Sequence, residues 1–237
     1  MHTYTKIGNT ETLSSKVQSE IEKSILEKKF VPGDKLPTEQ GLCAMFGVSR
    51  TALREALQML SIQGLITIRK GSGIYVSEYD SAKAVKPMIQ YLQMSLDDEL
   101  MIQVEEVRII FEPQIAWLAA RNRDEVDVKY LEKNLSDMKN GNNSHTENQV
   151  EIDQKFHLRI CQATKNRIIA MQMDPIIQLL PQIHTRATIK TDTDINEVVA
   201  YHQKIFTAIK NQDSDGARKA MLDHLTVAEV TKTRILE

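Results

Sequence analysis

The chain has few cysteines and no long apolar run. These two features argue against a disulfide-stabilised protein and against a membrane-spanning one. Its 237 residues include two cysteines, Cys43 and Cys161, which lie among apolar positions and lack the spacing of metal-binding pairs. They predict small core residues in a reducing compartment rather than a disulfide. No stretch of about 18 apolar residues occurs, so no membrane span is expected. The first ten residues, MHTYTKIGNT, lack an apolar signal core, and we therefore expect a cytoplasmic protein.

Catalytic signatures and strand patterns are also scarce. The chain contains neither HExxH nor GxSxG, and no general base is evident, so the sequence does not predict an enzyme. It shows no internal repeat and no low-complexity segment. Beyond residue 82 the apolar spacing is helical throughout. The formal net charge is −2, so any contact with nucleic acid must rest on a local excess of basic residues.

Residues 36–76 hold the most informative pattern. Thr38 is placed to cap one short helix, Gly47 to end it, and Ser49 to cap a second helix. Arg50 and Arg54 then point outward from the second helix. The inward positions recur at three- and four-residue steps: Leu53, Ala56, Leu57 and Leu60. Two helices around a glycine-containing turn predict a helix-turn-helix whose second helix suits the major groove of DNA.

A β-hairpin is predicted directly after this motif. Residues 65–68 and 74–76 have strand composition, and they flank a glycine-rich basic turn at residues 69–73. Between Ser49 and Lys70, four basic residues face one acid, Glu55. This local positive excess is what contact with DNA phosphates requires.

The stretch PGDKLPTEQGLCAMFGVSRTALREALQMLSIQGLI, followed by GSG, resembles the winged helix of the GntR family of bacterial transcription regulators. The resemblance covers residues 12–78. Gln40 stands where the family usually has a DNA-contacting Arg, and Ala52 stands where Pro, Thr or Val is common. The resemblance implies a homodimer that reads a palindromic, double-stranded operator. The expected DNA-contacting residues are Thr38, Gln40, Ser49, Arg50, Thr51, Arg54, Arg69, Lys70, Gly71, Ser72 and Gly73.

The expected fold is mainly α, in two domains. Residues 1–78 form a winged helix-turn-helix with a small β-hairpin wing, and residues 79–237 form an all-α antiparallel helical bundle. Residues 77–82 are the expected linker, and residues 140–143 an expected loop. The expected helices cover residues 12–29, 83–95, 98–122, 124–139, 147–163, 195–210 and 214–235, and residues 166–189 are expected to form one or two more. In residues 98–122 the expected inward stripe is Val104, Arg108, Phe111, Ile115 and Leu118.

Three of these helices carry ionisable residues on stripes that should be apolar. They are Asp153 and His157 on one helix, His202 on the next and His224 on the last. A buried carboxylate is costly unless it is paired or bound to a cation. Asp153 and His157 are four residues apart and so share a helix face. From the residues alone, two readings stay open: hydrogen-bonded core histidines, or a metal site inside the bundle.

A second resemblance bears on this choice. Asp153-x-x-x-His157, then His202, then His224, resembles the ligand pattern of the C-terminal effector (FCD) domain in the FadR branch of the GntR family. The Glu-Val-Arg-x-x-x-Glu-Pro stretch around Arg108 belongs to the same resemblance. It implies one divalent metal ion per chain, either Zn, Ni, Fe or Mn. Members of the branch that bind fatty acyl groups lack these ligands, so this chain is similar to those that sense a small acid.

Effector-binding residues can be suggested on the same basis. Arg108 lies on an inward stripe, where it could grip the carboxylate of a small acid or pair internally with Glu105 or Glu112. His184 and Arg186 follow an apolar run and are expected to line the same cavity. The expectation is a DNA-binding repressor controlled by a small carboxylate at the metal. The alternatives are a purely structural ion, a regulator that senses the ion itself, and a metal-dependent hydrolase.

Overall fold

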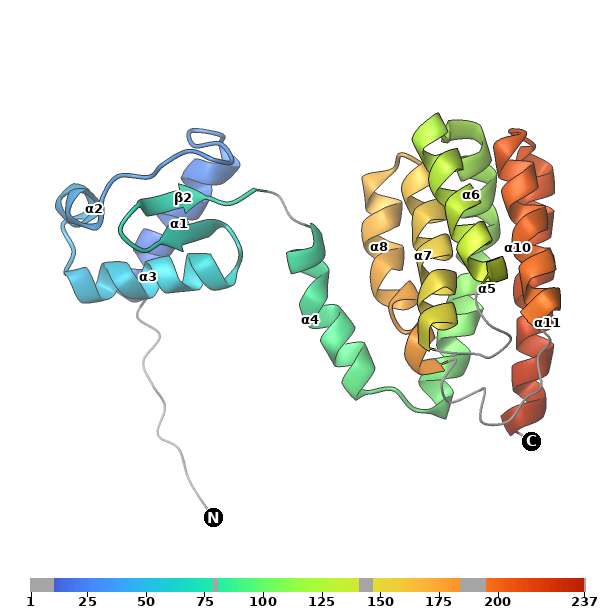
Figure 1. Ribbon diagram of the computed structural model, residues 1–237. Helices are drawn as coiled ribbons and strands as arrows, with labels where there is room; N and C mark the ends of the chain where they lie inside the picture. The colour runs from blue at the N-terminus through green and yellow to red at the C-terminus, as the bar shows by residue number, and fades with distance from the viewer. Residues whose placement is uncertain (1–10, 79–80, 141–146, 184–194, 237) are drawn as a thin grey trace, which may run out of the picture. The chain divides into compact units, whose positions relative to one another are not determined.

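The computed structural model describes residues 11–78, 81–140, 147–183 and 195–236 (Figure 1). The chain divides into two compact units, Met1–Ala84 and Val85–Glu237, and each is considered separately below. Within the described residues, no helix is long and apolar enough to cross a membrane. The mainly helical fold with one two-stranded antiparallel sheet confirms the expected fold class.

The first unit is a helix-turn-helix followed by a hairpin. Thr38 and Ser49 cap their helices as predicted, because their hydroxyl oxygens accept hydrogen bonds from the backbone N–H groups of Gly41 and Ala52. Gly47 ends the first of these helices with a φ of 65°, a left-handed conformation that favours glycine. The elements are α1 (Leu13–Leu26), α2 (Glu39–Phe46), α3 (Arg50–Ile62), β1 (Ile66–Arg69) and β2 (Gly73–Val76).

The hairpin forms the predicted wing with a small shift in its first strand. The strands pair antiparallel from Ile66 opposite Val76 to Arg69 opposite Gly73. We expected the first strand to start at Leu65, which was wrong by one residue. The N–H of Leu65 donates to the carbonyl of Leu60 at 2.9 Å, so Leu65 still completes the end of α3.

The core of the first unit is the apolar face of α3 packed on α1. The predicted inward positions of α3 are all buried, as are three residues of α1 that follow the same helical spacing. This packing turns the opposite face of α3, with Arg50, Thr51 and Arg54, to solvent. The buried residues are Val17, Ile21, Ile25, Leu53, Ala56, Leu57 and Leu60.

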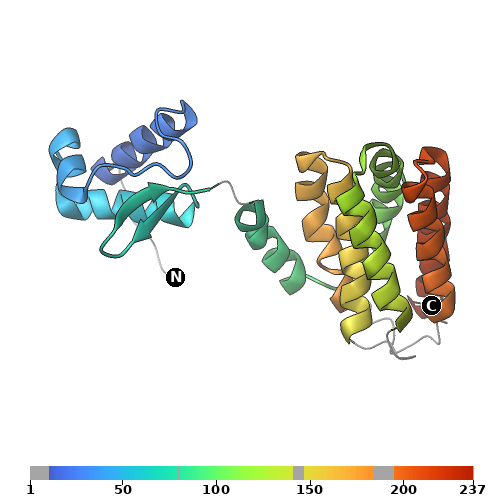
Figure 2. The same ribbon diagram turned by 45° about the horizontal axis from the view of Figure 1, so that its top comes forward.

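The second unit is helical wherever the structure describes it. Figures 1 and 2 both show the helices α5, α6, α7, α10 and α11 roughly aligned in one bundle. Very short connections at residues 123–124 and 211–213 join helices that are consecutive in the sequence. The elements are α4 (Ser81–Met94), α5 (Asp98–Asn122), α6 (Glu125–Asn140), α7 (Glu147–Ala163), α8 (Arg167–Ile177), α10 (Ile195–Lys210) and α11 (Ser214–Leu236).

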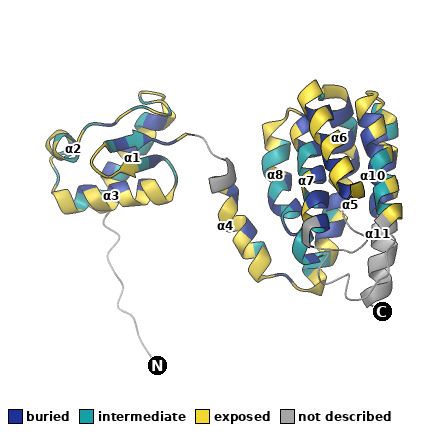
Figure 3. Ribbon diagram, in the orientation of Figure 1, coloured by how far each residue is buried: buried dark blue, intermediate teal, exposed yellow. Residues whose placement is uncertain are grey.

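One expected core stripe in the bundle was partly wrong. Phe111 of α5 is 52% exposed, whereas Glu112 beside it is buried. The buried stripe runs through residues 104, 108, 112, 115 and 119, so a carboxylate takes the place that we assigned to an aromatic ring. Figure 3 shows α5 with both buried and exposed residues along its length. Arg108, one turn earlier on the same stripe, provides the physical reason, as described below.

Candidate functional site

The four residues that resemble metal ligands come together inside the bundle. Asp153 and His157 lie on α7, His202 on α10 and His224 on α11. One potential ligand atom from each can be chosen so that all four lie within 4.8 Å of one another. Asp153 is 8% exposed, His157 1%, His202 0% and His224 9%. Three helices that are separate in the sequence thus place one carboxylate and three imidazoles around a single point.

Two of the imidazoles have their Nδ1 atoms occupied by acceptors. His202 Nδ1 lies 2.8 Å from the carbonyl oxygen of Val198, and His157 Nδ1 lies against Oε2 of Glu112. A carbonyl oxygen can only accept, and the Glu112 carboxylate is ionised, so each Nδ1 carries the proton. In the neutral imidazole this leaves the Nε2 lone pair, and Nε2 is the atom that faces the cluster in both residues.

The Nε2 atom of His202 is a buried polar atom without a hydrogen bond among the described residues. It lies 2.9 Å from Oδ1 of Asp153, but not in a direction that forms a hydrogen bond. His157 Nε2 lies 3.7 Å from the same oxygen. Two imidazole nitrogens and a carboxylate oxygen that converge in this way fit ligands of a shared cation.

The electrostatics of the cluster act in opposite directions on two of its imidazoles. Burial lowers the pKa of His157, but the carboxylates of Glu112 and Asp153 outweigh burial and raise that pKa to about 9. For His224, burial and the neighbouring His202 and His157 lower the pKa well below its ordinary value. His224 is therefore a neutral imidazole with a lone pair to offer. The donor set and its charges thus fit a divalent metal ion.

Arg108 of α5 borders this cluster from a buried position. Its Nε donates to Oε1 of Glu112 at 2.6 Å, and its Nη1 lies 3.3 Å from Oε2 of Glu105. The internal ion pair that the sequence left open is therefore present, with both acids. Burial raises the pKa of Glu112, but the charges of Arg108 and His157 outweigh burial and lower it to about 2. Arg108 Nη2 lies 3.5 Å from His157 Nε2, so the guanidinium also reaches the candidate ligands.

The other two suggested effector residues, His184 and Arg186, lie outside the described residues. Glu112 was considered only as an ion-pair partner of Arg108, and its contact with His157 was not foreseen. The four-residue spacing from Arg108 places Glu112 on the same helix face, but nothing in the sequence relates α5 to α7.

The expected DNA-contacting residues lie on the first unit in two groups. Arg50, Thr51, Arg54 and Gln40 are exposed on α3 and α2. The hydroxyl oxygens of Thr38 and Ser49 accept from backbone N–H groups as helix caps. The wing exposes Arg69, Lys70, Gly71 and Ser72, and Gly73 begins β2 with a φ of 133°.

The wing also carries a basic residue that the sequence analysis did not select. Lys35 forms an isolated bridge with Tyr75 of β2, and its Nζ lies 5.7 Å from the centre of the Tyr75 ring. The guanidinium of Arg69 lies 4.7 Å from the same ring. A Cβ on Gly73 would approach Cε of Lys35 to 2.7 Å, so this glycine leaves room for the lysine side chain.

Comparison with known proteins identifies the family. Residues 13–76 match the family described as bacterial regulatory proteins, gntR family, and residues 103–227 match the FCD domain. The chain therefore belongs to the GntR family of transcription regulators, in its FadR-like group with an FCD domain. This confirms the resemblance seen in the sequence.

Individual relatives agree with this assignment. The HTH-type transcriptional regulator LutR of Bacillus subtilis is 32% identical over 207 residues, covering 84% of this chain and 91% of LutR. The galactonate operon transcriptional repressor of Escherichia coli is 29% identical over 202 residues, covering 84% of this chain and 88% of the repressor. These relatives regulate transcription and are not enzymes, as expected for this chain.

A solved structure shares the fold. The protein named Streptococcus agalactiae GntR matches with a TM-score of 0.68 and 24% identity, covering 93% of this chain and 99% of that chain. At this identity the match supports the arrangement of elements only. The winged helix and the helical domain thus occur together in a known regulator fold.

Proposed function

We propose that this transcription regulator controls its operator affinity through a small organic acid bound at a divalent metal ion in the helical domain. The observation that carries the proposal is the convergence of Asp153, His157, His202 and His224 from three helices. The proposed stoichiometry is one ion per chain. Zn, Ni, Fe and Mn all accept imidazole and carboxylate ligands, and the four side chains do not select among them.

The metal would supply coordination positions that the protein does not fill, where a carboxylate can bind. The protein would supply the second half of the recognition through Arg108. Its Nη2 lies 3.5 Å from His157 Nε2, and a guanidinium is suited to gripping a carboxylate. One relative is named for a galactonate operon, and galactonate is itself a small carboxylate. This supports an acid as the effector.

A second candidate function is a regulator in which the ion itself is the signal. The same four residues would support it, and exchange of the ion separates the two cases. A resident cofactor stays bound through dialysis against metal-free buffer, whereas a sensed ion leaves and changes DNA affinity as it does so. We favour the resident ion because all four ligands are buried.

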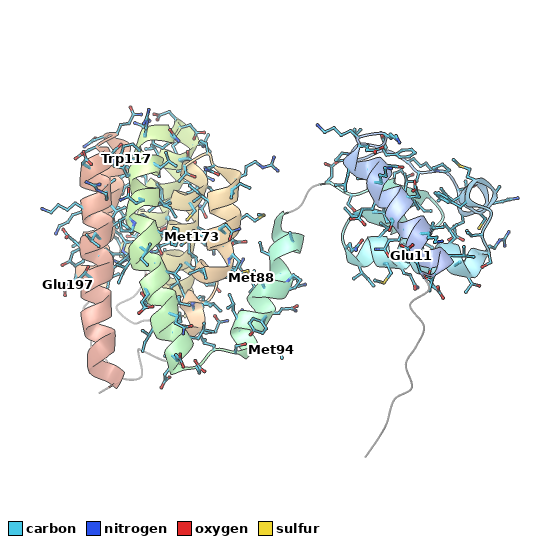
Figure 4. The ribbon with its side chains drawn as sticks, turned by 180° about the vertical axis from the view of Figure 1, so that it is seen from behind. Glu11, Met88, Met94, Trp117, Met173 and Glu197 are labelled. Carbon is cyan, nitrogen blue, oxygen red and sulfur yellow. The ribbon has the colours of Figure 1, made fainter. Side chains whose placement is uncertain are left out.

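We propose that the regulator is a homodimer that reads a palindromic operator and represses transcription in the cytoplasm. One winged helix covers a half-site only, so two copies are needed for a two-fold operator. The α4 helix has exposed apolar residues that a second copy could cover: Met88, Tyr91 and Met94. Figure 4 labels Met88 and Met94 on this helix. Sedimentation as a monomer at micromolar concentration, with and without DNA, would contradict this assignment.

The central test combines metal analysis with an effector screen. Elemental analysis of purified protein should find one divalent ion per chain. Carboxylates are then screened for a rise in melting temperature on metal-loaded protein. Each acid that binds is tested for its effect on binding to a DNA duplex that the wild-type protein selected from random sequence. An acid that binds tightly and leaves DNA affinity unchanged is not the effector, because allostery requires unequal affinity for the two states.

A further inference from the structure

A single buried carboxylate joins the candidate metal ligands to the arginine beside them. Both oxygens of Glu112 are used: Oε1 accepts from Nε of Arg108 at 2.6 Å, and Oε2 accepts from Nδ1 of His157. Glu112 is 2% exposed, Arg108 is 2% exposed and His157 is 1% exposed. Water does not compete for these contacts, so each contact restricts its partner more strongly than a surface contact would.

For His157 the consequence concerns the atom that faces the cluster. An imidazole that donates from Nδ1 to a carboxylate keeps the proton there, and its ring plane is fixed by the direction of that bond. Nε2 is then the ring nitrogen that can offer a lone pair to an ion, and it lies 3.7 Å from Oδ1 of Asp153. A carboxylate partner also makes the ring a better electron donor to a metal.

For Arg108 the consequence concerns the position of its positively charged guanidinium group. Its Nε is engaged by Glu112 and its Nη1 by Glu105. These two carboxylates hold the guanidinium beside the cluster, where its Nη2 lies 3.5 Å from His157 Nε2. Two carboxylates face this single positive charge, so neutralising one of them still leaves the charge balanced beside a metal ion.

We propose that Glu112 is a positioning residue for the metal centre: one of its oxygens orients the imidazole of His157, while the other is held by Arg108. Neither contact requires Glu112 to touch the ion. The inference deepens the proposed function, because it assumes that the four-residue cluster binds a divalent ion. Loss of such an outer carboxylate typically weakens metal binding by about 10- to 100-fold.

The test compares three full-length variants by zinc affinity, measured in competition with a chromogenic chelator. Glu112→Gln should weaken zinc binding by about 10- to 100-fold, because an amide cannot accept from both donors with its two end atoms. Glu105→Gln is the matched control, since it removes a neighbouring carboxylate that pairs with the same arginine, and it should change zinc affinity by less than about threefold. Arg108→Met keeps the contact between Glu112 and His157, and it should also retain zinc affinity.

A spectroscopic readout separates positioning from general loss of structure. With Co²⁺ as the probe, Glu112→Gln should shift the visible absorption bands, whereas Glu105→Gln should keep the wild-type spectrum. Glu112→Asp preserves the charge but shortens the side chain, so it should shift the bands while retaining helical circular dichroism. If Glu112→Gln fails to fold, Glu112→Asp decides the question: wild-type zinc affinity and wild-type bands in that variant overturn the proposal.

The outcomes for Glu112 and for the metal site are distinguishable. If the wild-type chain binds neither Zn²⁺ nor Co²⁺, the proposed metal function fails, and the positioning role fails with it. If the wild type binds both ions and Glu112→Gln binds them equally well with the same spectrum, the positioning role alone is wrong. Equal losses in Glu105→Gln and Glu112→Gln would also overturn it, because the effect would then follow the charge around Arg108 rather than the contact with His157.

Discussion

Arg54 on the second helix of the helix-turn-helix donates from Nε to Oε2 of Glu39 on the first, at 3.0 Å. The bond connects residues 15 positions apart in the sequence, and both side chains are partly exposed. A guanidinium held through Nε keeps its two terminal nitrogens in a defined direction. Those two nitrogens can make the bidentate contact with guanine that is common in major-groove recognition.

The first prediction concerns the recognition helix. Arg50→Ala and Arg54→Ala should each weaken binding to the selected duplex by about 1–3 kcal/mol if the side chain contacts a base edge. Stability should change little, because both residues are exposed. Gel-shift titration measures the affinity, and Lys23→Ala on α1 serves as the control. Unchanged binding in both arginine variants would contradict the assignment of α3 as the recognition helix.

The second prediction concerns Glu39. Removing a negative charge near DNA should strengthen binding to any sequence, since phosphates repel a carboxylate. If Glu39 orients Arg54, Glu39→Gln should instead weaken binding to the selected duplex relative to a scrambled duplex. The matched control is Glu55→Gln, which removes an exposed acid on α3 itself. It should strengthen binding to both duplexes or to neither. In an Arg54→Gln background, Glu39→Gln should no longer change the ratio of the affinities for the selected and the scrambled duplex.

The third prediction concerns the wing. Lys35 and Arg69 lie against the ring of Tyr75 at the hairpin, where we expect them to meet the DNA backbone. Lys35→Gln should weaken binding to selected and scrambled duplexes equally. It should also reduce the slope of log affinity against log salt by about 0.9, the value for one phosphate contact. Lys23→Gln, the same change on α1, should leave the slope unaltered. A change in base preference would argue for a different role.

The fourth prediction concerns metal removal. Chelation should lower the melting temperature, because an ion that binds only the folded chain stabilises it by mass action. Returning Zn²⁺ should restore the melting temperature, and His202→Ala should abolish the restoration. The affinity should fall as the pH is lowered, since protons compete with the ion for imidazole nitrogens. If neither a chelator nor added Zn²⁺, Ni²⁺ or Mn²⁺ changes the melting temperature, the metal site is wrong. The three histidines are then hydrogen-bonded core residues.

The elements and the grouping of the four candidate ligands could be predicted because each depends on local rules or on family resemblance. Caps at Thr38 and Ser49 follow from side-chain chemistry within three residues. The inward face of α3 follows from helical spacing. Most helix boundaries of the bundle agree with the expected ranges to within a few residues for the same reason, but the range 166–189 is interrupted: α8 ends at Ile177, and residues 178–179 form a turn before helix resumes at residue 180.

The features of the two candidate sites that sequence reasoning missed are tertiary. On α5 we expected the apolar Phe111 to face inward, because apolar residues usually do. Glu112 faces inward instead, because Arg108 on the same face and His157 on α7 offset the burial of its charge. Lys35 was missed because its partner Tyr75 lies on a strand that pairs with it only after folding.

The distribution of the four candidate ligands over α7, α10 and α11 has a topological consequence. An ion held by all four would act as a non-covalent cross-link that closes two consecutive loops of the chain, the first of which contains α8. Because the ion binds only the folded chain, opening either loop must break coordinate bonds to the ion, and this adds the free energy of metal binding to the cost of unfolding. Since His224 lies on the last helix, local detachment of α11 would require breaking a coordinate bond. Backbone amides around His224 should therefore exchange with solvent deuterium more slowly in the metal-loaded protein, and a protease should release the C-terminal helix more readily from the metal-free protein.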